Sequence, residues 1–572
     1  MRRFLVGFLA VVGALGLLLV AGAVAAAVYL ARAQPEMPER VVLTLDLRDA
    51  PSEVASADPL ARIGLRHRLS QSEILLTLNR AARDPRVAGL YARLDGDGPG
   101  LAQIQELRDA VAALREQGKF ALAFADSFGE LGPGTSGYYL ATAFDEVHLQ
   151  PLGFLGLIGL RIETPLAREL LDELGVAFDL ETRGEYKSLA ETFTRSDLSP
   201  AHREMLESLA DDVAAQLARG IAAGRGKGEA EVRALIDDGP YVADEALANG
   251  LVDALSYRDD VADAALARAG AGATLLSLAD YADRLEPEEA EPGATVALVY
   301  GAGRIVRGDG DGAPPIGGLL MGADTVADAL RGAIDDPGIE AILLRIDSGG
   351  GSAVASEAIG RQVRRAVAAG KPVVVSMGNA AASGGYWIAM GASHIVAAPA
   401  TLTGSIGVVA GKPVLDRLWD RLGVSWGTVQ RGANASMFSL NEPYDPAGRA
   451  RLQAFLDATY GAFVAGVAEG RDMPEAAVHE IARGRVWTGE RALELGLVDE
   501  LGGLPRAVEV TREILGLDPD APLALRVFPP PRGPFEQLLD LLPPRFGAVA
   551  PFEAVVERLR PGVLSAPPLV LR

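Results

Sequence analysis

The chain has 572 residues, of which 49% are hydrophobic and 23% are charged, a composition typical of a folded protein. Its net charge of −22 argues against nucleic acid as a partner, because nucleic-acid binding needs a basic face. The sequence has no cysteine, which excludes disulfides, thiolate catalysis and cysteine-based zinc sites.

The amino terminus predicts a membrane anchor over residues 1–35. Residues 4–31 form an uncharged run that follows Arg2 and Arg3. As a helix this run would be about 42 Å long, enough for a hydrocarbon core of roughly 30 Å, whereas secretory signals have an apolar part of only about 7–15 residues. The arginines favour a cytoplasmic amino terminus, so we expect a single-pass protein of the bacterial inner membrane with periplasmic domains. Cleavage as a signal sequence is the alternative, since residues 23–33 contain small-residue pairs that suit a signal peptidase.

The remaining chain predicts an α/β protein with two tandem domains of parallel-sheet βαβ repeats, because strand-length and helix-length segments alternate. We place the first domain at residues 36–285, a linker at 286–294 inside the acidic stretch 280–295, the second domain at 295–520 and a proline-rich tail at 521–572. The segments expected as strands are 41–47, 89–94, 119–125, 295–300 and 372–376, and those expected as helices are 104–117, 166–174, 356–368, 535–542 and 552–559. Glycine and proline predict a mobile loop at 307–318, and small residues predict a turn at 377–382.

Matching motifs about 250 residues apart indicate that the two domains arose by duplication. The Arg-Leu-Asp motif at 93–95 corresponds to Arg-Ile-Asp at 345–347, an offset of 252, and the Gly-Leu-Val-Asp motif at 250–253 recurs at 496–499, an offset of 246. Residues 183–188 align with 431–436 at an offset of 248. Such small drift in the offset indicates loop insertions and deletions between homologous domains.

In this alignment Lys187 corresponds to Ala435, and Ser383 corresponds to Thr135. Each domain therefore keeps one member of a potential Ser/Lys pair and lacks the other. A duplicated enzyme that divides its catalytic pair between two copies would show this pattern.

Ser383 is the candidate nucleophile. An apolar strand precedes it and a helix is expected from Gly384 onward, so Ser383 lies at a helix start, where free backbone N–H groups and the helix dipole favour negative charge. Its small neighbours allow a substrate backbone to approach closely. A serine here is also a common helix N-cap, so this motif alone does not establish catalysis.

A glycine-rich turn at 348–351 follows the preceding strand of the same expected sheet and leads into a helix. The backbone N–H groups that such a turn exposes can form an oxyanion hole. A phosphate-binding loop is the rival interpretation, but neither of the usual phosphate-loop glycine motifs is present.

Lys187 is the candidate general base. None of the five histidines lies in a triad-like setting, and we interpret His394 as a structural residue at the start of a strand. A lysine can act as a base when burial lowers its pKa from about 10.4 to about 7–8, which costs roughly 4 kcal/mol. The complementary alanine at 435 distinguishes Lys187 from the other lysines.

Four motifs, in order along the chain, resemble the long, duplicated form of bacterial signal peptide peptidase A, also called protease IV. These motifs are Gly184-Glu185-Tyr186-Lys187-Ser188, Asp347-Ser348-Gly349-Gly350-Gly351-Ser352, Ala382-Ser383-Gly384-Gly385-Tyr386 and Thr401-Leu402-Thr403-Gly404-Ser405-Ile406-Gly407. The resemblance extends from the anchor to about Leu504.

The resemblance implies a Clp-protease/crotonase-type fold in each domain and a serine peptidase with a Ser/Lys dyad. It assigns Ser383 as nucleophile, Lys187 as general base and Ser405 as a hydroxyl that orients the lysine amine. It also implies cleaved signal peptides and unfolded peptides as substrates, a homotetramer, and no metal or cofactor. The expected oxyanion donors are Gly384 together with Gly350 or Gly351. The choice between the last two stays open, because glycine at 349 replaces the proline that is usual in the family.

Two other functions remain as alternatives. A crotonase-like acyl-CoA enzyme would share the fold and use its glycine N–H groups on a thioester, but it is expected in the cytoplasm with a basic nucleotide site. A non-catalytic membrane scaffold would use the duplication for assembly alone. Such a scaffold would not need Ser383, Lys187 and Ser405 together.

Overall fold

The computed structural model describes residues 36–54, 68–96, 98–285, 293–310, 318–530 and 569–571, together with Gly16 and Gly22. Apart from Gly16 and Gly22, the expected anchor at 4–31 lies outside the described residues. So do residues 286–292 of the expected linker, residues 311–317 of the expected mobile loop and the expected tail helices at 535–542 and 552–559. Among the described residues, no helix has both the length and the apolar character needed to cross a membrane.

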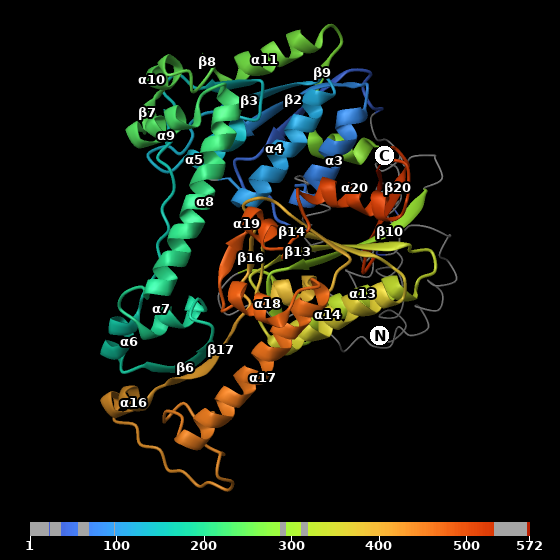
Figure 1. The fold of residues 1–572 in the computed structure, drawn as a ribbon. Coiled ribbons are helices and arrows are strands. Elements are labelled where there is room, and N and C mark those ends of the chain that lie inside the picture. The colour runs from blue at the N-terminus through green and yellow to red at the C-terminus, as the bar shows by residue number, and fades with distance from the viewer. Residues whose placement is uncertain are drawn as a thin grey trace, which may run out of the picture.

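The first half of the chain forms a sheet of six parallel strands (Figure 1). Its order is β8-β4-β3-β2-β1-β9. The central strand β3 has the sequence FALAFA and is buried at every position, as expected of a parallel strand that is covered on both faces. The strand bounds are β1 Val41–Asp46, β2 Val87–Leu94, β3 Phe120–Ala125, β4 Glu146–Leu149, β8 Ala254–Leu255 and β9 Thr274–Ser277.

The second half forms a nine-stranded sheet that repeats this order. Strands β19-β15-β14-β13-β10-β20 correspond one by one to β8-β4-β3-β2-β1-β9, and β16, β18 and β21 are additional. The shared topology supports the duplication that the repeated motifs predict. The bounds are β10 Ala294–Ala302, β13 Ala341–Ser348, β14 Val373–Ala382, β15 His394–Ala397, β16 Leu402–Gly404, β18 Val486–Thr488, β19 Glu500–Leu501, β20 Leu523–Phe528 and β21 Leu569–Leu571.

Three expectations need correction. The turn expected at 377–382 is wrong, because β14 continues to Ala382, where its last residues pair with β16. Strand β20 lies inside the segment assigned to the tail and pairs with β10, so the second sheet extends beyond residue 520. The acidic stretch 280–295 is not all linker, since helix α12 (Leu278–Arg284) and the start of β10 occupy its ends.

Helices separate and cover the two sheets (Figure 1). Helices α3 (Gln71–Arg83), α4 (Leu101–Glu116) and α20 (Leu504–Ile514) lie between them, and their apolar side chains share one core with side chains from both sheets. Helix α11 (Arg258–Ala269) covers the outer face of the first sheet. The outer face of the second sheet packs against α13 (Ala323–Asp335), α14 (Ala353–Ala368), α15 (Gly384–Ala389) and α17 (Pro446–Gly470).

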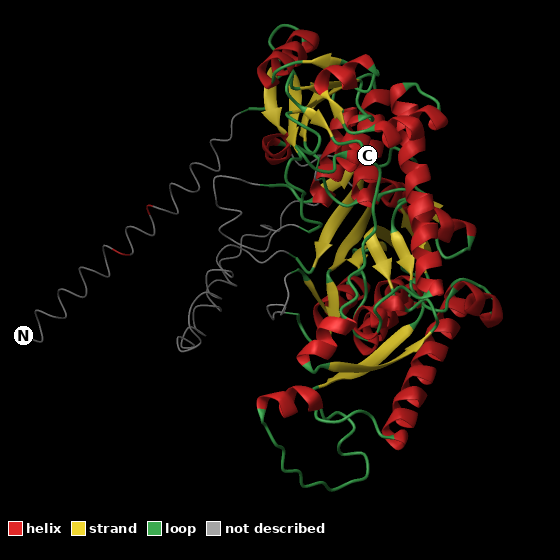
Figure 2. Cartoon of the chain, turned by 90° about the vertical axis from the view of Figure 1, so that its left-hand side faces the viewer, coloured by secondary structure: helices red, strands yellow, loops and turns green. Residues whose placement is uncertain are grey.

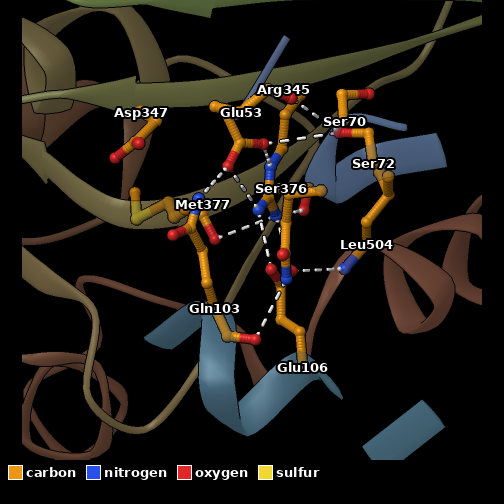
Figure 3. Close-up of polar contacts among 12 residues, drawn as sticks. Glu53, Ser70, Ser72, Gln103, Glu106, Arg345, Asp347, Ser376, Met377 and Leu504 are labelled. Carbon is orange, nitrogen blue, oxygen red and sulfur yellow. Dashed lines mark hydrogen bonds and ion pairs between the residues drawn. The ribbon is translucent and has the colours of Figure 1, made fainter. Parts of the chain in front are cut away.

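A buried ion-pair cluster joins the two halves (Figure 3). The Arg345 guanidinium on β13 donates to both carboxylate oxygens of Glu106 on α4, at 2.6 and 2.7 Å, and to Glu53 at 2.6 Å. The Leu504 N–H at the start of α20 donates to the same Glu106 carboxylate at 2.9 Å. Burial alone would lower the pKa of Arg345, but the charges of Glu106 and Glu53 hold this pKa well above its usual value. The second sheet is therefore fastened to helices from both halves.

Two elements reach from the first half to the far end of the second (Figures 1 and 2). Strand β6 (Ala177–Arg183) pairs antiparallel with β17 (Val408–Val414), with Arg183 opposite Val408. The long helix α8 (Pro200–Arg225) runs beside both sheets. The remaining elements are α5 Thr135–Ala141, β5 Phe154–Leu155, α6 Arg168–Leu174, the 3-10 turn Ser188–Ala190, α7 Glu191–Thr194, α9 Glu229–Asp238, β7 Tyr241–Val242, α10 Ala243–Ala248, β11 Arg304–Val306, β12 Leu320–Gly322, α16 Asp416–Leu422, α18 Glu475–Ile481 and α19 Gly489–Glu494.

Candidate active site

Ser383 lies in a sharp turn between β14 and α15. Its backbone angles are φ 54° and ψ −115°, a conformation that costs a non-glycine residue about 1–3 kcal/mol. The Ser383 N–H donates to the Gly404 carbonyl at 2.8 Å, and its own carbonyl accepts from the Trp387 N–H at 2.9 Å. The strand and the helix thus hold Ser383 in a strained position at the end of the sheet.

Strand β6 brings Lys187 from the first half of the chain to Ser383. The Lys187 Nζ atom lies 3.0 Å from Ser383 Oγ, 2.9 Å from the Ser405 carbonyl oxygen and 2.9 Å from Ser405 Oγ. The three polar side chains singled out in the sequence therefore meet at one point.

The three contacts of Nζ match the bonding of a neutral amine, which has two N–H groups and one lone pair. The Ser405 carbonyl can only accept, so it takes one N–H, and Ser405 Oγ can take the second. The lone pair then remains for the hydroxyl proton of Ser383. This arrangement suits removal of that proton by Lys187.

Burial lowers the pKa of Lys187 from about 10.5 to about 8. Loss of solvation penalises the charged ammonium, so about half of the amine is neutral near pH 8. A lysine with this pKa can serve as a general base without strong alkali.

Ser405 follows β16 and is itself held in an unusual backbone conformation. Its φ is 51°, and its side chain is buried. The Ser405 N–H donates to the Arg485 carbonyl at 2.7 Å. Both of its contacts to Lys187 depend on this conformation.

The glycine-rich turn lies directly against Ser383. Gly350 has φ +103°, and a Cβ there would lie 2.9 Å from Ser383 Cβ, so only glycine allows this approach. The Gly350 N–H donates to Ser348 Oγ at 3.1 Å. Within the described part of the chain, by contrast, the N–H groups of Gly351 and Gly384 have no protein acceptor.

A cleft of about 270 Å³ opens beside the Ser383–Lys187 pair. Apolar side chains line most of it, among them Trp387 and Phe463, whose rings lie 4.5 Å apart. A second, apolar cavity of about 300 Å³ adjoins it through Phe455 and is lined by Ala410, Gly411, Met437, Phe438, Tyr444 and Leu452. These surfaces can receive an apolar peptide segment.

Comparison with known proteins gives the family of the chain. The sequence model of peptidase family S49 matches residues 114–272 and 365–518, which together exceed half of the chain. The chain belongs to peptidase family S49. It is 33% identical to Protease 4 of Salmonella typhi over 78% of this chain and 72% of that protein. It is 30% identical to the chloroplastic serine protease SPPA of Arabidopsis thaliana over 78% of this chain and 66% of that protein.

The family assignment makes the chain a serine peptidase and confirms the resemblance to the long, duplicated form of signal peptide peptidase A. A solved structure of a ClpP1 point mutant from Listeria monocytogenes covers 37% of this chain and 94% of its own, at 15% identity. Its TM-score of 0.24 is too low to carry an argument about the fold.

At the positions related by the duplication, the described residues of this S49 peptidase form no second dyad. Thr135, the counterpart of Ser383, begins α5, and its Oγ1 accepts from the Ile158 N–H at 3.2 Å. Ala435, the counterpart of Lys187, is exposed in a loop. His394 begins β15, as expected, and its Nε2 atom lies 3.5 Å from the Glu500 carboxylate.

Sequence reasoning missed two sets of residues in this S49 site. Ser348 Oγ donates to the Gly303 carbonyl at 2.6 Å while it accepts from Gly350, so it fixes the glycine turn. Residues 483–485 contact both the loop of Lys187 and Ser405. The sequence does contain a signal for the second set, because Arg-Gly-Arg at 483–485 corresponds to Asp-Asp-Gly at 237–239 in the first domain.

Proposed function

We propose that the protein is a membrane-anchored serine endopeptidase that uses a Ser383/Lys187 dyad to degrade cleaved signal peptides and similar unfolded segments. The observation that carries the proposal is the placement of Lys187 Nζ at 3.0 Å from Ser383 Oγ and within hydrogen-bond distance of both Ser405 oxygens. Membership of family S49 favours this function over an acyl-CoA enzyme or a scaffold.

In the proposed reaction, neutral Lys187 takes the hydroxyl proton of Ser383 as Oγ attacks a peptide carbonyl. The tetrahedral intermediate collapses to an acyl-enzyme when Lys187 passes that proton to the leaving amine. Lys187 then takes a proton from the water that attacks the ester, and it returns a proton to Ser383 Oγ when the acid product leaves. Ser405 orients the amine through both of its contacts.

The oxyanion of each tetrahedral intermediate needs backbone donors close to Ser383. The N–H groups of Gly351 and Gly384 are the best candidates, since neither donates a hydrogen bond to a protein acceptor in the described part of the chain. Gly350 then contributes its small size, because its own N–H is bonded to Ser348.

The apolar lining of the site and the expected membrane anchor both fit signal peptides as substrates. The cleft and the adjoining cavity are lined mainly by apolar side chains, which suits the apolar core of a signal peptide. The uncharged run at 4–31 would hold the enzyme at the inner membrane, with both domains in the periplasm. The homotetramer and the Clp-protease/crotonase-type fold implied by the sequence resemblance belong to the same proposal.

The proposal is tested with the full chain in detergent and a synthetic signal peptide. We expect the wild-type protein to cut the peptide internally and Ser383→Ala to leave it intact, with both proteins equally folded by circular dichroism. Thr135→Ala is the matched control in the first domain and should cleave as the wild type does. Equal cleavage by Ser383→Ala would refute the assignment of the nucleophile.

A further inference from the structure

The loop that carries Lys187 is held against the second domain by residues 483–485, which the proposed reaction does not use. The Tyr186 N–H donates to the Arg483 carbonyl at 3.0 Å, and the Arg483 guanidinium lies 3.1 Å from the Glu185 carboxylate. Segment 483–485 therefore fixes the two residues that directly precede the proposed base.

The same segment holds the serine that contacts the base. The Ser405 N–H donates to the Arg485 carbonyl at 2.7 Å, and the Gly484 N–H donates to the Ile406 carbonyl at 2.8 Å. Ser405 and Arg483 both have a left-handed backbone, at φ 51° and 49°, which is unfavourable unless neighbouring contacts enforce it. Three consecutive residues thus support both the loop of Lys187 and the conformation of Ser405.

Backbone contacts at this point are closer than side chains would allow. A Cβ on Gly484, whose φ is +81°, would lie 2.5 Å from the backbone nitrogen of Lys187. A Cβ on Gly184 would lie 2.1 Å from the Arg483 carbonyl carbon, and one on Gly407 would lie 2.7 Å from Gly484 Cα. The loop of Lys187, segment 483–485 and the residues after Ser405 are therefore in direct backbone contact, so a shift in one moves the others.

The Arg485 side chain fixes the segment to the first domain. Its guanidinium donates to both carboxylate oxygens of Glu204 on α8, at 2.7 and 2.8 Å. It also lies 4.9 Å from the ring centre of Tyr186 and 4.3 Å from that of Trp487. A planar guanidinium can stack and form a bidentate ion pair at the same time, which a lysine cannot do.

The arginines of segment 483–485 occur only in the domain that carries the nucleophile, as the alignment of the two domains shows. At the offset of 246 that aligns β7 with β18, residues 483–485 correspond to Asp237, Asp238 and Gly239. The first domain thus has neither an arginine counterpart of Arg485 nor a serine counterpart of Ser383.

We propose that Arg485 is a positioning residue for the dyad, which holds Tyr186 and Ser405 so that the Lys187 amine stays enclosed and faces Ser383. This inference rests on the proposed Ser/Lys mechanism. Arg485 acts through its neighbours and takes no part in bond making or breaking.

The pH dependence of the rate reports on this role. The charged groups around the Lys187 loop form ion pairs with one another, namely Arg483 with Glu185, Arg485 with Glu204 and Arg183 with Asp457. Burial is what lowers the pKa of Lys187. A loosened loop would admit water, and the pKa of Lys187 would rise toward its ordinary value.

The test compares the pH profile of kcat for full-length wild type, Arg485→Ala and Arg219→Ala. Arg219 is a matched control, because it lies on α8 and its guanidinium donates to both carboxylate oxygens of Glu490 in the second domain, at 2.7 and 2.8 Å. For Arg485→Ala we expect kcat at pH 8 to fall about 10- to 100-fold, KM to change little, and the midpoint of the profile to move up by about one pH unit. Arg219→Ala should keep the wild-type midpoint. If Arg485→Ala does not fold, Glu204→Gln gives the same comparison, with a smaller upward shift expected.

Lys187→Ala in the same assay separates the two proposals. If Lys187→Ala is inactive and Arg485→Ala keeps the wild-type midpoint, the positioning role is overturned and the proposed function stands. If Lys187→Ala is as active as the wild type, the Ser/Lys mechanism is overturned and the positioning role with it. An upward shift in Arg485→Ala that is absent from Arg219→Ala supports the inference.

Discussion

Lys187 and Ser383 are 196 positions apart in the sequence, yet their Nζ and Oγ atoms lie 3.0 Å apart. One comes from the first domain and the other from the second, so the site exists only when the two domains are packed together. Duplication thus produced one composite site in place of two complete ones.

The peptidase rate should rise with pH and level off above the pKa of Lys187. The proposed base works only when neutral, and burial lowers its pKa to about 8, so the rate should be half-maximal near pH 8. The measurement is kcat for a signal peptide between pH 6 and pH 10.5. A profile that still climbs at pH 10 without a plateau would contradict a depressed lysine pKa.

Ser405→Ala should reduce kcat by about 10- to 100-fold, less than the loss of either dyad member. The variant removes one of the three contacts of Nζ but leaves the Ser405 carbonyl oxygen at 2.9 Å. Steady-state kinetics at pH 9, where Lys187 is mostly neutral, measure the effect. A loss as large as that of Lys187→Ala would instead indicate that the Ser405 hydroxyl takes part in proton transfer.

Arg345→Met should destabilise the protein by about 3–5 kcal/mol, because it leaves the Glu53 and Glu106 carboxylates buried without their partner. The duplication supplies a control in Arg93, which corresponds to Arg345 but pairs with the half-exposed Asp126. We expect less than about 1 kcal/mol for Arg93→Met. Thermal unfolding by calorimetry compares the two variants. Equal shifts in Tm would show that the buried cluster stabilises the fold no more than the exposed Arg93–Asp126 pair does.

Removal of residues 1–35 should release the protein from the membrane and leave its peptidase activity intact. Every proposed catalytic residue lies beyond the uncharged run at 4–31. Fractionation of cells that express each form, followed by a peptide assay, tests this expectation. A mature full-length product that begins near Ala33 in the periplasm would show that the segment is a cleaved signal.

The sequence predicts the alternation of strands and helices, the duplication and the meeting of Lys187 with Ser383. The last is possible because the two domains lost complementary residues, which leaves a trace in the alignment. The continuation of β14 through Ala382 was missed, because small residues there are equally typical of a turn and only pairing with β16 extends the strand.

Contacts between distant segments are the part that the sequence does not reveal. Arg93 and Arg345 occupy equivalent motifs, yet only Arg345 is buried, because α4 and α20 pack onto its sheet and not onto the corresponding face of the other. Arg485 depends in the same way on Glu204, which is 281 positions away. Local sequence patterns do not show which distant residues will form such pairs.

The most direct test of the Ser383/Lys187 dyad is covalent labelling with a serine-reactive fluorophosphonate, with the adduct located by mass spectrometry. We expect one rapid adduct, on Ser383 Oγ, in the wild type at pH 9, and a reaction slower by about 10³-fold or more in folded Lys187→Ala. An adduct on a different residue, or labelling of Ser383 in Lys187→Ala within tenfold of the wild-type rate, would contradict the Ser383/Lys187 dyad.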